Sequence, residues 1–351
     1  MRPSTAMSQK VLCLSEDVVK KCLDMKECLR INRQAFINLA QGRVHVPTRI
    51  GIPYRDPQEH GTASDDAADF TLFKPATIPD QNVMACKVVS IRQHNPSRHG
   101  LPLVPATIVS VDPPTGIVNG LVAGTYLTGA RTATGSALST VLYQPNVQRL
   151  VIFGAGLQAK LHVQALAAAL ERPIPHVTLI NRTVARAQTL GQELMETTDW
   201  AEQVEALPLS AGDDDNSVAD ALAQADVIVT ATNTTTPLFA DSATLKTNCH
   251  ICSVGSYTPQ MQEIPPGIVD QCTVIYDTHE ALAVGDLRHL TDAHPRHLLG
   301  NVLALSEPPP RDPHMPYTFF KSVGTAIQDA CTTRMVMEKA REMKLGVEVD
   351  L

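Results

Sequence analysis

The stretch Leu150-Val151-Ile152-Phe153-Gly154-Ala155-Gly156-Leu157-Gln158-Ala159 decides the fold of this 351-residue chain. Four apolar residues that read as a buried strand run directly into the two glycines, and a helical pattern follows. In a Rossmann-type unit the first glycine permits a tight turn, and the second lets the backbone approach a pyrophosphate. Free N–H groups at the start of the helix then bind the phosphates. The stretch predicts a dinucleotide-binding loop; a glycine turn in an unrelated α/β fold is the alternative.

Strands and helices continue to alternate after this stretch. Short apolar runs at 177–180, 227–230, 251–254 and 274–276 have the length and composition of buried strands. Such alternation is typical of a parallel sheet covered by helices. The sequence therefore predicts an α/β fold whose centre is a Rossmann-type, doubly wound parallel sheet.

The N-terminal part has a different pattern. It is expected to open with helices, one of which starts after Asp24 and ends near Gly42. Residues 83–91 read as a strand, and residues 107–122 as a hairpin around a Pro-Pro-Thr-Gly turn. We expect a mostly antiparallel sheet here. The end of the chain, from Tyr317 onward, is expected to be an amphipathic helix.

The residues after the second Rossmann strand bear on the type of dinucleotide. An NAD enzyme usually has an acidic residue here that binds the ribose 2′-OH. This chain has Asn181-Arg182-Thr183 instead. Arg182 can pair with a 2′-phosphate, and Asn181 and Thr183 can donate to it. The segment favours NADP(H), with NAD(H) as the alternative if Arg182 is only a solvated residue.

Three cations occupy unusual positions. Lys87 lies inside an apolar strand, where a lysine is costly to bury without a partner. Arg131 is expected in the first turn of a helix that Thr128 caps, where a cation opposes the helix dipole. Arg49 precedes an apolar residue. Each alone could be a surface or salt-bridge residue; together they fit a pocket for a carboxylate.

Composition limits the classes of function. The formal net charge of -7 argues against a nucleic-acid partner. The start of the chain lacks the pattern of a signal peptide, and no apolar run is long enough for a membrane span, so we expect a cytoplasmic protein without a membrane partner. The cysteines are scattered, as is typical of reduced thiols. Cys249-His250-Ile251-Cys252 reads as strand; a redox or zinc site is the alternative, and no metal is expected.

The chain resembles the ornithine cyclodeaminase/mu-crystallin family over nearly its whole length. The segments that carry the resemblance are residues 131–137, the glycine loop with Gln158, Ser253-Val254-Gly255, and residues 319–330, which read Phe-Phe-Lys-Ser-Val-Gly followed by Ile-Gln-Asp-Ala. The Glu280-Ala281 and Gly285-Asp286 pairs also look like the family's pattern.

The resemblance implies a homodimer of two-domain subunits that act on a small amino or imino acid. Residues 129–321 would form the NAD(P)-binding Rossmann domain. Residues 1–128 and 322–351 would form a discontinuous α+β domain for substrate binding and dimerisation. Arg49, Lys87 and Arg131 would bind the substrate carboxylate, with Lys87, Arg131 and Tyr257 as the catalytic candidates. The implied cofactor-binding residues are Thr132, Gly154, Gly156, Leu157, Gln158, Asn181, Arg182, Thr183, Thr230, Ala231, Thr232, Val254, Ser322 and Gly324.

One departure from the family's pattern affects the reaction. The cyclodeaminases and alanine dehydrogenases have an Asp two residues after the glycine that matches Gly255, and this chain has Tyr257. Mu-crystallin also lacks that Asp, and its cofactor segment is similar to residues 181–183. The resemblance therefore implies NAD(P)H-dependent reduction of a small, cyclic α-imino acid. A cyclodeaminase that recycles bound NAD, or a binding protein of low activity, are the alternatives.

Overall fold

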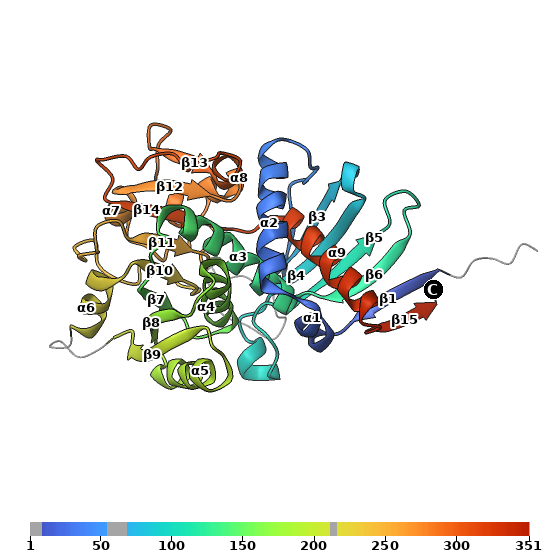
Figure 1. Ribbon diagram of the computed structural model, residues 1–351, viewed down its shortest axis with the longest axis horizontal. Helices are drawn as coiled ribbons and strands as arrows, with labels where there is room; N and C mark the ends of the chain where they lie inside the picture. Colours follow the sequence, from blue (N-terminus) through green and yellow to red (C-terminus); the bar gives the residue numbers. More distant parts are fainter. Residues whose placement is uncertain (1–8, 55–68, 211–215, 351) are drawn as a thin grey trace, which may run out of the picture. The chain divides into compact units, whose positions relative to one another are not determined.

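The structure, a computed structural model, describes residues 9–54, 69–210 and 216–350. The chain divides into two compact units (Figure 1). Unit 1 comprises Met1–Asp24, Gly42–Thr128 and Thr325–Leu351, and unit 2 comprises Met25–Gln41 and Gly129–Gly324. The segment Met25–Gln41 groups with unit 2 because its helix packs on another helix of that unit. The assignment of substrate binding and dimerisation to unit 1 stays a prediction.

Unit 1 is built on the mostly antiparallel sheet that the sequence predicted. Its strand order is β15-β1-β6-β5-β4-β3-β2, and only the β1–β6 pair is parallel among the described strands. The strand over residues 83–91 and the hairpin are confirmed. The bounds are β1 (Lys10–Leu14), β2 (Ile50–Tyr54), β3 (Asp69–Ile78), β4 (Val83–Ile91), β5 (Ala106–Val111), β6 (Val118–Ala123) and β15 (Val347–Asp350).

The helices of unit 1 are α1 (Glu16–Cys22) and α9 (Ala326–Glu342), with short helical turns at Pro79–Gln81 and Asn95–His99. Helix α9 packs on β3, β4 and β5 and covers one face of the sheet. Alternate residues of β4 are buried on that face, as the period of two requires. The expectation that the described chain opens with helices was wrong, because β1 precedes α1; five residues are too few for periodicity to separate strand from helix.

Unit 2 is the Rossmann-type α/β unit. Its strands are all parallel, in the order β13-β12-β14-β11-β10-β7-β8-β9. The chain runs outward from β7 through β8 to β9 and then crosses to β10 on the other side. Dinucleotides bind at such a reversal, outside the carboxyl ends of the strands. The bounds are β7 (Arg149–Phe153), β8 (Ile174–Asn181), β9 (Ala201–Pro208), β10 (Val227–Thr230), β11 (His250–Ser253), β12 (Cys272–Tyr276), β13 (Arg296–Leu298) and β14 (Tyr317–Lys321).

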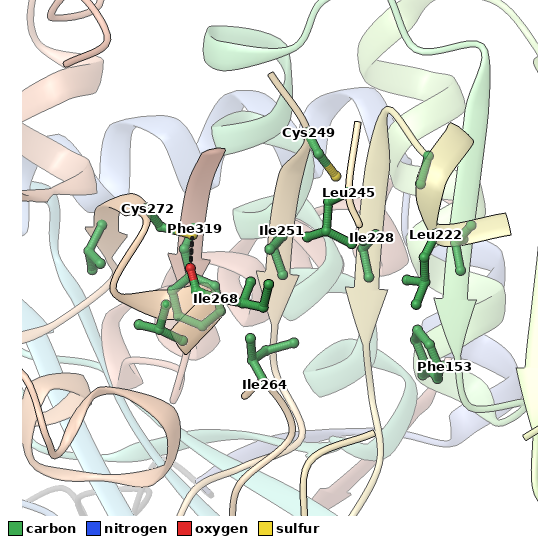
Figure 2. Close-up of a cluster of buried hydrophobic side chains, with 14 of the residues drawn as sticks. Phe153, Leu222, Ile228, Leu245, Cys249, Ile251, Ile264, Ile268, Cys272 and Phe319 are labelled. Atoms are coloured by element: carbon green, nitrogen blue, oxygen red, sulfur yellow. Dashed lines mark hydrogen bonds between the residues drawn. The ribbon is translucent and has the colours of Figure 1, made fainter. Parts of the chain in front are cut away.

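The strands at the centre of this sheet are buried along their whole length, since helices and loops cover both faces. Figure 2 shows Ile228, Ile251 and Phe319, from β10, β11 and β14, in one apolar layer of the core. The helices of unit 2 are α2 (Met25–Ala40), α3 (Thr125–Tyr143), α4 (Leu157–Leu170), α5 (Val184–Thr197), α6 (Ser217–Gln224), α7 (Pro266–Val269) and α8 (Leu299–Leu303), with short turns at His279–Ala283 and Gly285–Leu287; the first turn of α3 belongs to unit 1.

Two predictions at the edges of unit 2 were wrong. Helix α3 begins at Thr125, and the N–H of Thr128 already donates to the Gly124 carbonyl at 2.8 Å, so Thr128 lies inside the helix and does not cap it. Residues Tyr317–Lys321 form a buried strand rather than the start of a helix. Aromatic and β-branched residues favour a strand there, but a run of five fits both patterns. Within the described residues, no helix is both long and apolar enough to span a bilayer.

Candidate active site

The glycine loop has the geometry that the sequence predicted. Gly154 has a φ of +115°, and a Cβ on it would lie 2.8 Å from the Ala231 carbonyl oxygen, so a side chain is excluded there. Gly156 precedes α4, and a Cβ on it would meet no described atom within 4 Å. The space beside Gly156, at the start of α4, is therefore open. The loop has room for the phosphates beside a helix N-terminus.

Three more of the predicted cofactor segments lie at the same edge of the sheet. Thr230 ends β10 and residues 231 and 232 follow it, Val254 follows β11, and Ser322 follows β14. Backbone hydrogen bonds join these strand ends in series: Ala231 N to Phe153 O at 2.9 Å, Val254 N to Thr230 O at 3.0 Å, and Ser322 N to Ser253 O at 3.1 Å. Unit 2 thus brings these segments together with the glycine loop.

The segment at the end of β8 is accessible. Arg182 and Thr183 are exposed, and Asn181 is half-buried. Asn181 Nδ2 donates to the Thr183 carbonyl at 2.9 Å, so this amide is engaged within the segment. The Asn181 amide is therefore less available to a 2′-phosphate than the sequence suggested, and Arg182 carries most of the NADP(H) hypothesis.

Unit 2 contains a buried charged cluster that sequence reasoning missed: Glu263, Asp286 and Lys321, each 0% exposed. Lys321 Nζ lies 3.2 Å from Asp286 Oδ2 and donates to the hydroxyls of Ser253, at 3.0 Å, and Ser256. Asp286 Oδ1 accepts from the N–H groups of Glu263, at 2.6 Å, and Ile264, at 2.9 Å. A lysine inside an apolar strand, as at Lys87, was the available signal for Lys321.

Glu263 connects two of the cofactor segments. Its Oε1 accepts from the N–H and the hydroxyl of Thr232, both at 2.7 Å, and its Oε2 accepts from Thr230 Oγ1 at 2.9 Å and Gly255 N at 2.8 Å. Burial raises the pKa of Glu263, although Lys321 opposes this. Burial also acts to raise the pKa of Asp286, but Lys321 and the hydrogen bonds outweigh it and lower that pKa. The cluster holds the loops after β10 and β11 in one conformation.

Arg131 is buried in unit 2, with 4% of its surface exposed. It lies beyond the first turn of α3, because the helix begins earlier than expected, so the argument from helix-dipole repulsion was wrong. Its guanidinium lies against Gly324, in the loop after β14. Thr132 beside it is 8% exposed, and Tyr257, in the loop after β11, is half-buried.

Lys87 and Arg49 belong to unit 1. Lys87 is 1% exposed and forms an ion pair with Asp329 of α9 at 2.8 Å, and it donates to Thr128 at 3.3 Å. Lys87 is thus paired with a carboxylate, which offsets the cost of burying its charge. Lys74 of β3 is directly opposite Lys87, is 6% exposed, and was also missed. Arg49 immediately precedes β2, whose first residue, Ile50, pairs with Phe73, the neighbour of Lys74 in β3.

The Cys249–Cys252 segment is confirmed as strand, since all but its first residue lies in β11. Both cysteines are free and buried, and burial raises the pKa of Cys252 to about 12. A thiol protonated at neutral pH is a poor nucleophile and metal ligand. Among the described residues, no group of three or more His, Cys, Asp or Glu side chains could hold a metal ion.

The strand order, the glycine loop and the joined strand ends define a Rossmann-type dinucleotide-binding fold with a second, discontinuous unit. Residues 8–344 match the model of the ornithine cyclodeaminase/mu-crystallin family, so the chain belongs to that family.

Relatives of known or named activity are similar over nearly the full length. The chain is 30% identical to an uncharacterized cyclodeaminase of Dictyostelium discoideum, over 97% of this chain and 100% of that one. It is 29% identical to a Delta(1)-pyrroline-2-carboxylate reductase of Bacillus cereus, with the same coverage. The structure of the Thermococcus litoralis Delta(1)-pyrroline-2-carboxylate reductase in complex with NADH and L-proline matches with a TM-score of 0.83 and 26% identity, over 97% of this chain and 100% of that one.

Proposed function

We propose that this protein is an NAD(P)H-dependent reductase of a small, cyclic α-imino acid. The observation that carries the proposal is the position of Arg131. Its buried guanidinium lies beside the loop after β14, and that loop belongs to the same strand-end series as the glycine loop. A guanidinium binds a carboxylate through two parallel hydrogen bonds, which fixes both the position and the orientation of the acid. A carboxylate on Arg131 would hold the adjacent C=N bond at the edge where the cofactor binds.

The residues of this chain then have to bind and orient the substrate and to protonate its imine nitrogen. The nicotinamide, when bound, supplies a hydride to the imine carbon and is oxidised, and the nitrogen takes up one proton. We propose that Arg131 and Arg49 bind the carboxylate and that Lys87 donates a hydrogen bond to the substrate and assists protonation of the imine nitrogen. The Lys87–Asp329 pair supports this role, because a buried ion pair holds the ammonium group in one place. Positioning accounts for most of the catalytic task in such a reaction.

The experiment follows nicotinamide absorbance with NADPH, Delta(1)-pyrroline-2-carboxylate and its six-membered-ring homologue. We expect oxidation of NADPH that requires an imino acid. In Arg131→Met, kcat/KM should fall by at least about 100-fold, because the substrate loses a charged hydrogen bond and is no longer held in position. No oxidation of NADPH with any imino acid, together with ammonia release from ornithine under NAD, would contradict the proposal. Light scattering tests the homodimer that we also propose.

The cofactor preference is a second element of the proposal. We propose NADP(H), because the end of β8 has Arg182 and lacks the acid that binds a ribose 2′-OH. NAD(H) is the alternative, and the NADH in the Thermococcus litoralis complex favours it. Arg182→Ala should raise the Kd of NADPH by about 10-fold or more, the value of one charged hydrogen-bonded contact, and leave that of NADH nearly unchanged. An equal effect on both would contradict the NADP(H) assignment.

Two other functions remain as outcomes of these tests. The Dictyostelium discoideum relative is named a cyclodeaminase, and a cyclodeaminase would release ammonia without net cofactor oxidation. Tyr257, in place of the family's Asp, argues against that reaction. A binding protein of low activity would bind NADPH saturably without turnover, and the retained Arg49, Lys87 and Arg131 argue against it.

A further inference from the structure

The loop after β14 is folded around a single carboxylate. Asp277 directly follows β12 and is 0% exposed. Its Oδ2 accepts from Ser322 Oγ at 2.8 Å, Val323 N at 3.0 Å and Gly324 N at 2.6 Å. Its own N–H donates to the Lys321 carbonyl at 3.1 Å. Because one buried oxygen accepts from three consecutive residues, the carboxylate fixes the backbone conformation of this loop.

Gly324, the last residue bound by Asp277, lies against Arg131. Its φ is +72°, a conformation that favours glycine. A Cβ on Gly324 would lie 2.8 Å from Arg131 Nη2 and 2.9 Å from Cζ, and closer still to Nη1. The space that any other residue's side chain would need is therefore occupied by the guanidinium itself. Gly324 is required here both by the backbone and by its neighbour.

We infer that Asp277 and Gly324 are positioning residues for Arg131. Asp277 holds the loop, and the bare backbone of Gly324 forms the surface against which the guanidinium plane lies. A planar guanidinium binds a carboxylate in two-point geometry only when its plane is correctly oriented. The loop therefore determines how the substrate acid is presented. This inference rests on the proposed role of Arg131 in carboxylate binding.

Gly324→Ala tests the inference, and the chain offers a matched control. Gly116 also has a φ of +72°, but a Cβ on it would meet no atom of the described residues within 4 Å. Both alanine variants thus incur the same backbone cost, and only Gly324→Ala displaces Arg131. We expect Gly324→Ala to lower kcat/KM for Delta(1)-pyrroline-2-carboxylate by about 100-fold, the effect of a misplacement near 1 Å, whereas Gly116→Ala keeps the wild-type value.

A double-mutant cycle shows whether Gly324 acts through Arg131. In the Arg131→Met background, Gly324→Ala should have no further effect on kcat/KM, because the group that it displaces is gone. Additive losses would overturn the inference. If Gly324→Ala does not fold, Asp277→Asn takes its place in the same cycle, with the same expectation. The Kd of NADPH, measured by fluorescence, should change less than the KM for the imino acid. A variant that weakens only cofactor binding would also overturn the inference.

Crystal structures separate this inference from the proposed function. If wild-type protein reduces no imino acid, or if Arg131→Met binds and turns over substrate normally, the proposed function of the site fails. The position of the guanidinium in crystals of Gly324→Ala and Asp277→Asn still decides the structural step. We expect a displaced guanidinium in both variants and an unmoved one in Gly116→Ala. An unmoved guanidinium in Gly324→Ala would overturn the inference whatever the enzyme's activity.

Discussion

Replacing Lys321 with methionine removes the only positive charge found among the described residues of the Glu263–Asp286–Lys321 cluster. The variant keeps the length and apolar surface of the side chain, so the core packing of β14 changes little. It leaves the two carboxyl groups 0% exposed and without the ammonium that lies 3.2 Å from Asp286. Breaking a buried ion pair by removing one partner costs about 3–5 kcal/mol, because the remaining charge is uncompensated. For a unit of this size the melting temperature should fall by about 10 °C.

The penalty should depend on pH in a definite direction. Burial already raises the pKa of Glu263 above its ordinary value, and Lys321 opposes that rise. Without Lys321 the pKa rises further, so the folded variant binds a proton that the unfolded chain does not. Stability that depends on such a proton is present below the unfolded pKa and is lost as pH rises through the folded pKa. Lys321→Met should therefore be closer to wild type at pH 5 than at pH 8.

Thermal and urea unfolding at the two pH values measure this effect, and Lys160→Met is the matched control. Lys160 forms an ion pair with Glu193 on the surface of the same unit, with side-chain exposures of 28% and 44%. Its loss should cost less than about 1 kcal/mol at either pH. A loss in Lys321→Met as small as in Lys160→Met, or one independent of pH, would refute the reasoning about the cluster.

Three further outcomes follow from single positions. Gly156→Ala should fold normally but lose NADPH affinity, because its Cβ would occupy the open space in which a pyrophosphate would lie. Gly154→Ala should also lower the melting temperature, because its Cβ would meet the Ala231 carbonyl. Equal melting temperatures of the two variants would contradict this. Burial lowers the pKa of His162 to about 4, so the stability that it contributes is complete above pH 6.5 and lost as pH falls towards 4. Between pH 7 and pH 5, wild type should lose about 2 kcal/mol more than His162→Gln in urea unfolding, and parallel curves would contradict this. Phe319→Ala should destabilise unit 2 by about 3–5 kcal/mol, as removal of a fully buried ring does.

The Rossmann unit was predictable because its information is local. The strand at 150–153, the glycines and the helix from Leu157 lie together in the sequence, and each residue has one physical reason to be there. The same holds for the strand at 83–91, where every second residue is buried and the buried positions include the β-branched Val83, Val89 and Ile91. Predictions failed where a short apolar segment fits two patterns, as at Tyr317–Lys321, which is a strand in the middle of the sheet.

The buried cluster was not predictable, because strand order creates it. Strand β14 lies between β11 and β12 in the sheet, although it follows both in the chain (Figure 1). This insertion brings Lys321 next to Ser253, which is 68 residues away in sequence. No spacing or composition rule connects the two positions. The sequence predicted a helix at Lys321. Asp286 was noted only as part of the family's pattern, and nothing in the sequence indicated that it shares a buried cluster with Glu263 and Lys321.

The insertion of β14 also explains why the cofactor segments and Arg131 are both held in place by residues at the end of β14. Lys321, at the end of β14, binds Asp286, which accepts from the Glu263 N–H, and Glu263 holds the loops after β10 and β11. The next residues, through Asp277, form the surface on which Arg131 lies. A shift of β14 would therefore move both the charged cluster and the loop beside Arg131. Lys321→Met disturbs the cluster alone, and Gly324→Ala disturbs the loop alone. If the proposed reaction needs donor and acceptor in one fixed geometry, a variant that shifts β14 should impair cofactor and substrate binding to a similar degree, whereas Gly324→Ala should impair substrate binding more than cofactor binding.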